Sequence, residues 1–306
     1  MPELPEVENV ARALRQALLG RRLDGLRVRF AGALKPSPRA VKRAVVGKRL
    51  AEVRRHGKYL LLRFAPDGAD PGGSRDMLGA GGAADRVAES PPPYGAGGAA
   101  QLALHLRMTG QIFVRPDYRP DKHLRLVLDF EGRPVYYRDL RKFGGFALVE
   151  DAHRPEALAH VGPDMLEIPF RDWHARLARR RAPLKSLLLH QGIAAGLGNI
   201  YADEALLRAG LHPLTRPADL DEAALRRLWR EARTVLRLAI RHGGTTYQDF
   251  LRFDGRPGRF YGMLRVYGRE GEPCRACGRP VRKIRVGGRG THYCPGCQPE
   301  PARRRP

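Results

Sequence analysis

Apolar residues recur with a helical period at the start of the chain and with a period of two in the stretches that follow. Residues 6–19 put Val7, Val10, Leu14 and Leu18 on one stripe, which predicts an amphipathic helix. Short alternating runs come next and predict β-strands at 23–30, 49–64, 102–114, 123–130, 133–140 and 144–150. The first half of the chain is therefore expected to be mostly antiparallel β-structure.

From about residue 151 the apolar period changes to 3.6 residues, which predicts helices at 169–181, 183–191, 199–210 and 221–243. The last of these has one face formed by Leu225, Leu228, Ala232, Val235, Leu236 and Ala239. A glycine-rich segment at 243–262 then leads into a cysteine-containing end. Residues 66–100, rich in Gly, Ala and Pro, have too little apolar surface to offset ordering entropy, so we expect a disordered surface insertion there.

The charge of the chain points to a polyanionic partner. Its 306 residues include 56 Lys and Arg against 32 Asp and Glu, a formal charge of +24 that favours nucleic acid as the partner. A solvated arginine-rich surface is the simpler alternative. Apolar runs stay well below the ~18 residues of a membrane span, and Glu3, Glu6 and Glu8 lie where a signal peptide is cationic. A cytoplasmic protein without membrane contact is expected.

Four cysteines form two CxxC pairs separated by 16 residues, Cys274–Cys277 and Cys294–Cys297. Two such turns at the tips of a hairpin offer four thiolates to a tetrahedral Zn²⁺, whereas disulfides are rare in the cytosol. All four ligands are protein thiolates, so one structural zinc is expected. The basic segment between the pairs, with Arg289 at a glycine turn, suits contact with phosphate. A binding module without catalysis, or four unrelated thiols, would be the alternatives.

The first residues, MPELPEVENV, have a chemical interpretation. Removal of Met1 would leave Pro2 with a secondary α-amine, and α-amino groups titrate near pH ~7.7–8. Such an amine can attack a sugar carbon and form an iminium, with Glu3 as a neighbouring proton shuttle and Glu6 one turn further on. The alternative is a helix N-terminus that carries acids because its dipole favours them.

Six motifs, in order, closely resemble the bacterial formamidopyrimidine-DNA glycosylases. They are MPELPEVENV at the start, HGKYLLL at 56–62, HLRMTG at 105–110, RDLRKFGG at 138–145, GLGNIYADEAL at 196–206 and GGRGTHYCPGCQ at 287–298. The resemblance runs from residue 2 to about 298, apart from the insertion and the tail. It implies an α+β multidomain fold: an N-terminal antiparallel β-sandwich with flanking helices, a helix–two-turn–helix domain and a C-terminal zinc-ribbon hairpin. The expected boundaries are 1–150, 151–262, 263–298 and a tail at 299–306.

The resemblance also implies catalytic roles. Pro2 would be the Schiff-base nucleophile at the deoxyribose C1′, and Glu3 the acid that helps to open the sugar ring. Lys58 would assist β-elimination and contact phosphate near the lesion, although alone it reads equally well as a solvated strand lysine. Arg289 would grip the same phosphate and donate a proton for δ-elimination; its alternative is an exposed turn residue.

Further positions match DNA-contacting residues of that family. Asn199 would hold phosphate, although by residue type it is an N-cap candidate. The others are His105, His123 and Arg181, and a lone histidine is more often structural.

An enzyme that extrudes a base must fill the hole left in the stack. Met108, Arg141 and Phe143 match the residues that do so in the family, although Met108 and Phe143 read alone are ordinary β-core residues. A loop from Thr245 to Gly262 would cover the everted base.

The expected function is therefore base excision repair: excision of 8-oxoguanine and formamidopyrimidines from double-stranded DNA, then β,δ-elimination at the abasic site, by a monomer that associates with the nucleoid. Two alternatives remain open at this point. One is an endonuclease VIII-like glycosylase for oxidised pyrimidines, and the other is a non-catalytic nucleic-acid-binding zinc-ribbon protein.

Overall fold

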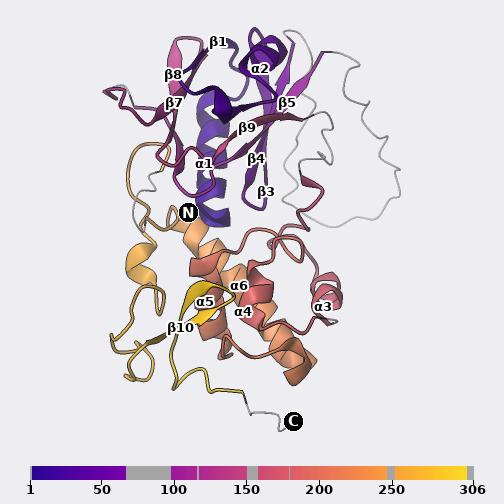
Figure 1. The fold of residues 1–306 in the computed structure, drawn as a ribbon, viewed down its shortest axis with the longest axis vertical. Coiled ribbons are helices and arrows are strands. Elements are labelled where there is room, and N and C mark those ends of the chain that lie inside the picture. Colours follow the sequence, from indigo (N-terminus) through magenta and orange to yellow (C-terminus); the bar gives the residue numbers. More distant parts are fainter. Residues whose placement is uncertain are drawn as a thin grey trace, which may run out of the picture.

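The computed structural model describes residues 2–66, 98–115, 117–149, 158–178, 180–246 and 252–301. The predicted insertion lies outside the described residues except at its two edges. Figure 1 shows a β-rich upper lobe and a helical lower lobe, with the C-terminal hairpin against the lower one. None of the described helices is long and apolar enough to cross a membrane.

The first helix, α1, spans Leu4–Leu18 and confirms the N-terminal periodicity, because the predicted stripe is buried. A second helix, α2 at Pro38–Val45, was not predicted from the sequence. Ser37 caps it by accepting a hydrogen bond from the Ala40 N–H, and Pro38 fits its first turn. Only Val41 and Val45 of α2 are buried, a pattern too short to detect from periodicity.

Two sheets face each other in the upper lobe. One has the strand order β1-β7-β8-β6, and the other β2-β9-β5-β4-β3; all pairs are antiparallel except β2–β9. The strands are β1 (Leu23–Val28), β2 (Leu34–Lys35), β3 (Arg49–His56), β4 (Tyr59–Ala65), β5 (Ala100–His105), β6 (Gly110–Phe113), β7 (Leu124–Phe130), β8 (Arg133–Asp139) and β9 (Gly145–Val149). Phe64 of one sheet stacks on Phe130 of the other at 6.4 Å, inside a core shared with α1. The predicted β-sandwich with flanking helices is confirmed.

The lower lobe is built on the predicted helices. They are α3 (Phe170–Ala178), α4 (Leu184–Leu189), α5 (Asn199–Ala209) and α6 (Glu222–Arg241). Among the described residues, 3₁₀ turns lie at Ala31–Ala33 in the upper lobe and at Pro217–Asp219 and Tyr261–Met263. The predicted apolar face of α6 is entirely buried and packs with Trp173 and Tyr201 in the core of this lobe.

The C-terminal hairpin pairs β10 (Arg282–Val286) with β11 (Arg289–Tyr293). It lies against α5, where Leu207 shares a small core with Val266 and Cys294. At the turn, the added Cβ of a residue larger than Gly287 would come within 2.7 Å of Ser186 Oγ, so the hairpin tip sits close on α4.

The β3–β4 turn joins the two lobes. Asp164 accepts hydrogen bonds from the Gly57 N–H at 2.8 Å and from the Arg55 guanidinium, and both charged side chains are buried. Gly57 has φ +55°, and a Cβ there would meet Ala195 Cβ at 2.6 Å. The turn therefore packs closely against Asp164 and Ala195 of the lower lobe, and these contacts fix the position of Lys58.

Candidate active site

Glu3 connects the start of the chain to α5. It is the N-cap residue of α1, it is buried, and its carboxylate points at the N-terminus of α5. Oε2 accepts a hydrogen bond from the Gly198 N–H at 2.7 Å, and Oε1 accepts one from the Ile200 N–H at 3.0 Å. A helix N-terminus presents free N–H groups and a positive dipole end, so it is a natural seat for a carboxylate. This seat fixes Pro2, which is also buried, beside α5.

A second buried carboxylate, Glu6, lies in the first turn of α1, next to Glu3. Its Oε1 accepts hydrogen bonds from the Tyr201 hydroxyl at 2.5 Å and the Thr245 N–H at 2.7 Å, and its Oε2 accepts one from the Glu3 N–H at 2.7 Å. Burial, and next the negative charge of Glu3, raise the pKa of Glu6 to about 7, against the hydrogen bonds that lower it. At neutral pH Glu6 is therefore divided between its charged and neutral forms.

Lys58 is not a solvated strand lysine. It lies in the turn between β3 and β4, it is 6% exposed, and no described residue accepts a hydrogen bond from its ammonium. Burial lowers the pKa of Lys58, the negative charges of Glu3 and Glu6 oppose this, and Arg289 adds to it. The structure thus brings four predicted catalytic positions together: Pro2, Glu3, Lys58 and Arg289.

Arg289 is the first residue of β11, directly after the Gly287–Gly288 turn, and it is exposed. Asn199 holds the next residue of the same strand, because its Nδ2 donates to the Gly290 carbonyl at 2.9 Å. The N-cap interpretation of Asn199 is wrong, since Gly198 occupies that position. Asn199 Oδ1 is buried and has no hydrogen-bond partner among the described residues.

Two acids of α5 hold the C-terminal module, and the sequence reasoning missed both. Asp203 Oδ1 pairs with the buried Lys185 ammonium at 2.5 Å, and its Oδ2 accepts from the His292 N–H at 2.9 Å. Glu204 Oε1 accepts from three successive backbone N–H groups, at Arg265, Val266 and Tyr267, within 3.0 Å. The available signal was the pair of adjacent acids inside an otherwise apolar helix.

The loops proposed to fill the base stack lie together at one end of the sandwich. Phe143 is 59% exposed and the Arg141 guanidinium lies 4.7 Å from its ring centre, so the core interpretation of Phe143 is wrong. Met108 is half-buried in the β5–β6 loop, outside the buried core. Asp139, which was also missed, joins the two loops by accepting from Thr109 Oγ1 at 2.6 Å and from backbone N–H groups of the 140–144 loop.

His105 lies at the end of β5 beside a cavity of about 340 Å³ that Phe143 also lines. Burial, followed by the positive charges of Arg107 and Lys58, lowers the pKa of His105 to about 3, so the ring is neutral at physiological pH. Its Nδ1 accepts from the Arg107 N–H at 2.8 Å, which leaves a proton on Nε2 as a neutral donor.

The remaining predicted DNA contacts differ in setting. His123 is half-buried in the turn before β7, and Arg181 is exposed after α3. Thr245 is buried next to Glu6. Of the predicted lesion loop, residues 247–251 lie outside the described residues. Phe253 packs in the core of the upper lobe, and its carbonyl accepts from the Val114 N–H at 3.1 Å.

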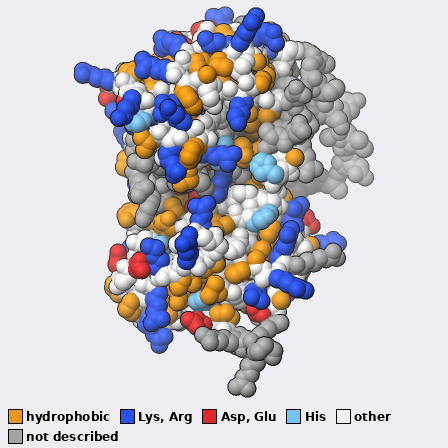
Figure 2. All heavy atoms as spheres, viewed as in Figure 1, with side chains coloured by type: hydrophobic (Ala, Val, Ile, Leu, Met, Phe, Trp, Pro, Cys, Tyr) orange, Lys and Arg blue, Asp and Glu red, His pale blue; other side chains and the backbone are white. Residues whose placement is uncertain are grey.

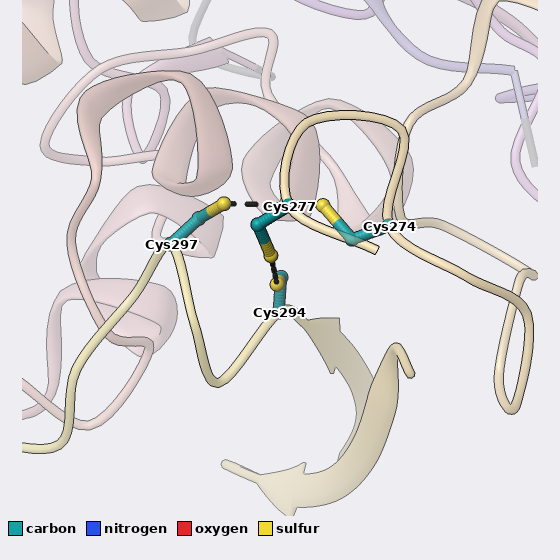
Figure 3. A group of neighbouring side chains, drawn as sticks. All are labelled: Cys274, Cys277, Cys294 and Cys297. Carbon is teal, nitrogen blue, oxygen red and sulfur yellow. Dashed lines mark hydrogen bonds between the residues drawn. The ribbon is translucent and has the colours of Figure 1, made fainter. Parts of the chain in front are cut away.

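The four cysteines converge (Figure 3), and their sulfur atoms all lie within 4.8 Å of one another. Tetrahedral Zn²⁺ with Zn–S bonds of about 2.3 Å separates its sulfurs by about 3.8 Å. The Cys274–Cys297 and Cys277–Cys294 sulfur separations are 3.9 and 3.4 Å, so the site fits this ion. The cysteine turns lie at the open end of the β10–β11 hairpin, not at its tip as expected, because the strands connect through Gly287–Gly288.

Basic side chains are frequent on the surface of both lobes. Figure 2 shows Lys and Arg spread over the pictured face, with few acidic side chains among them. A buried pair of carboxylates, a buried lysine and an exposed arginine thus belong to a protein whose surface suits phosphate.

Three family models match the chain. The Formamidopyrimidine-DNA glycosylase N-terminal domain matches residues 1–146, the Formamidopyrimidine-DNA glycosylase H2TH domain matches residues 161–250, and the zinc finger found in FPG and IleRS matches residues 271–299. A formamidopyrimidine-DNA glycosylase of Methylococcus capsulatus is 39% identical over 305 residues, covering 97% of this chain and all of that protein.

Solved structures of formamidopyrimidine-DNA glycosylases are also similar to this chain. The MutM (Fpg) protein of Thermus thermophilus has 39% identity and a TM-score of 0.78, covering 98% of this chain and 99% of that one. A Lactococcus lactis Fpg mutant bound to DNA containing Fapy-dG has 28% identity and a TM-score of 0.80, covering 98% and 100%.

Fold, site and relatives together define a DNA glycosylase that works in base excision repair. The chain belongs to the formamidopyrimidine-DNA glycosylase family. Its four cysteines hold one structural Zn²⁺, which stabilises the hairpin that carries Arg289.

Proposed function

We propose that this enzyme excises oxidised purines, 8-oxoguanine and ring-opened formamidopyrimidines, from double-stranded DNA and then cleaves the abasic strand. The Lactococcus lactis relative described above was solved with DNA containing Fapy-dG, which supports this class of substrate. One chain acts alone on each lesion, in the cytoplasm and on the nucleoid. For the domains we propose the boundaries 1–150, 151–262 and 263–298, with a tail at 299–306.

In the proposed reaction, removal of Met1 exposes the Pro2 amine, whose lone pair attacks the deoxyribose C1′. Glu3 supplies a proton to the ring oxygen as the sugar opens, and the damaged base leaves with its bonding electrons. The resulting iminium is cationic and acidifies the C2′ protons. Loss of one such proton expels the 3′-phosphate by β-elimination, and δ-elimination then expels the 5′-phosphate, leaving a one-nucleotide gap.

Lys58 and Arg289 serve the elimination steps in this proposal. Burial lowers the pKa of Lys58, which favours its neutral form as the group that accepts a proton near C2′. Arg289, exposed at its turn, grips the phosphate and donates the proton for δ-elimination.

DNA contacts are assigned to His105, His123, Arg141, Arg181 and Asn199. Met108, Arg141 and Phe143 fill the gap in the stack. The exposed Phe143 ring, with the Arg141 guanidinium over it, supports the gap-filling role. An aromatic side chain can hold the neighbouring bases apart, and a guanidinium can donate hydrogen bonds to the base left without its partner.

One observation carries the proposal: the Glu3 carboxylate is held on the N-terminus of α5. A zinc-ribbon protein that only binds DNA has no need for a buried acid fixed beside its second residue.

Borohydride trapping on a duplex with one 8-oxoguanine opposite cytosine tests this function. N-terminal sequencing first establishes that Met1 is absent, and peptide mapping then locates the reduced iminium. The expected adduct is on Pro2, and Arg289→Gln should still form it because that residue acts later. Tight binding without an adduct would point to the non-catalytic alternative, and an adduct formed only on oxidised pyrimidines to the endonuclease VIII-like one.

A further inference from the structure

The outer face of α6 carries a row of arginines that the proposed chemistry does not use. The row is formed by Arg226, Arg230, Arg233, Arg237 and Arg241. At 3.6 residues per turn these positions fall within an arc of about 80°, and at 1.5 Å per residue they extend over about 22 Å. The row is therefore a narrow, straight band of positive charge.

This band faces away from the active site. The apolar side of α6, with Leu228 and Val235, is buried in the core of the lower lobe. α5 lies between α6 and the C-terminal hairpin: Asp203 contacts the hairpin, while Arg208 pairs with Glu231 of α6 at 2.8 Å. On a helix, the arginines lie on the side opposite this apolar face. The arginines therefore lie on the side of α6 that points away from the core of the lower lobe.

Two of the five arginines have partners. Arg226 pairs with Glu222 at 2.6 Å, and Arg233 donates to the Ile168 carbonyl at 3.0 Å. The other three, Arg230, Arg237 and Arg241, are exposed, and no described carboxylate lies within ion-pair distance of them.

We propose that the α6 arginine face, defined as Arg230, Arg237 and Arg241, binds a second segment of duplex DNA while the active site holds the first. Duplex DNA carries one charge per about 1.7 Å of its axis, so the roughly 16 Å from Arg230 to Arg241 spans about ten phosphates. The three guanidinium groups, about 10 and 6 Å apart along the helix axis, form a line of positive charge that can follow a line of phosphates. An enzyme that holds two segments can pass from one to the other without dissociating into solution.

The test uses a triple variant, Arg230→Gln, Arg237→Gln and Arg241→Gln, and a charge-matched control on α2. The control is Arg39→Gln, Lys42→Gln and Arg43→Gln, which removes three exposed cations from α2 in the upper lobe (Figure 1). Each protein is first saturated with a short duplex containing a reduced abasic site, which cannot react with an amine. A labelled undamaged duplex is then titrated by fluorescence anisotropy between 50 and 200 mM salt.

For wild type and the α2 variant, we expect a second binding event that weakens about 40-fold across this salt range, as three phosphate contacts require. In the α6 variant all three contacts are removed, so this second binding event should be lost, while single-turnover excision on the short duplex should stay within two-fold of wild type. Thermal unfolding of both variants establishes that they are folded. Absence of a second binding event in wild type overturns the proposal, as does equal loss in both variants. Because the readout is binding to a non-reacting duplex, it does not depend on the Schiff-base chemistry.

Discussion

At the scale of the residue, the site depends on carboxylates whose neighbours come from distant parts of the chain. Glu6 accepts from Tyr201 and Thr245, which are 195 and 239 residues further along. The sequence placed Glu6 one turn after Glu3, and this was correct, but spacing carries no information on which distant segments bury a side chain. The raised pKa of Glu6 could therefore not be predicted.

The Glu6 environment predicts a pH dependence of stability. Its pKa of about 7 in the folded protein exceeds the ordinary 4.5, so the folded state retains a proton that the unfolded chain releases between these values. The stabilisation is complete below about pH 4.5 and is lost as the pH rises through 7, a change of about 3 kcal/mol. Urea unfolding at pH 5 and pH 8 should show this loss in wild type and little of it in Glu6→Gln.

The control for this measurement is Glu222→Gln on α6, where the side chain is 61% exposed. It should keep the wild-type difference between pH 5 and pH 8. An identical pH dependence in Glu6→Gln and wild type would contradict the assignment.

At the scale of the element, α5 organises the site. Its N-terminus holds Glu3, Asp203 holds the hairpin, and Glu204 holds the backbone at 265–267. Periodicity predicted both α5 and α6 to within two residues at each end, since their apolar positions are strongly periodic. The contacts of Asp203 with Lys185 and His292 were not predictable, because a helical wheel shows that a position is polar but not which distant residues pack against it.

Asp203→Asn is expected to loosen the hairpin. The substitution leaves the Lys185 ammonium buried without its counter-charge, which costs about 3 kcal/mol of stability. Because His292 and Arg289 share β11, Arg289 should also move away from the phosphate that we propose it contacts. Gel analysis of abasic-strand cleavage should show more product stopped after β-elimination and less δ-elimination. Glu231→Gln, which breaks a half-exposed pair, should change neither quantity measurably.

Loss of zinc should separate DNA binding from the fold of the sandwich. Cys277→Ser removes one of four thiolates, and we expect it to abolish DNA binding measured by anisotropy while the upper lobe keeps its β-sheet circular dichroism. Arg275→Ser, a neighbouring exposed position, serves as the control and should bind both zinc and DNA. Wild-type DNA affinity in a zinc-free Cys277→Ser protein would refute the role given to the hairpin.

At the scale of the whole molecule, the candidate active site is formed where the two lobes meet. The upper lobe contributes Pro2, Glu3 and Lys58. The lower lobe contributes the backbone N–H groups of α5 that bind the Glu3 carboxylate, and the hairpin against it contributes Arg289. The motifs pointed to these residues in the sequence, and the order of the motifs along the chain predicts the order of the domains. The relative placement of the lobes depends on contacts such as Arg55 with Asp164, and no local pattern specifies those.

Asp164→Asn tests this junction. It removes the buried partner of Arg55 and weakens the bond to Gly57, so we expect a loss of about 3 kcal/mol and a lower rate of excision because Lys58 shifts. Urea unfolding and single-turnover kinetics measure the two effects. Asp172→Asn, an exposed carboxylate on α3, should leave both unchanged. A fully stable Asp164→Asn enzyme with normal kinetics would show that the lobes are held together in another way.

The seat of Glu3 has a consequence for how this sequence can vary. The groups that hold the carboxylate are backbone N–H groups at 198 and 200, so side chains along the first turn of α5 can change without removing them. Gly198 is different, since a Cβ there would come within 2.4 Å of Glu3 Cδ. Residue 198 is therefore restricted by space alone, whereas Asn199 and Tyr201 on the same turn are restricted by the hydrogen bonds that their side chains donate.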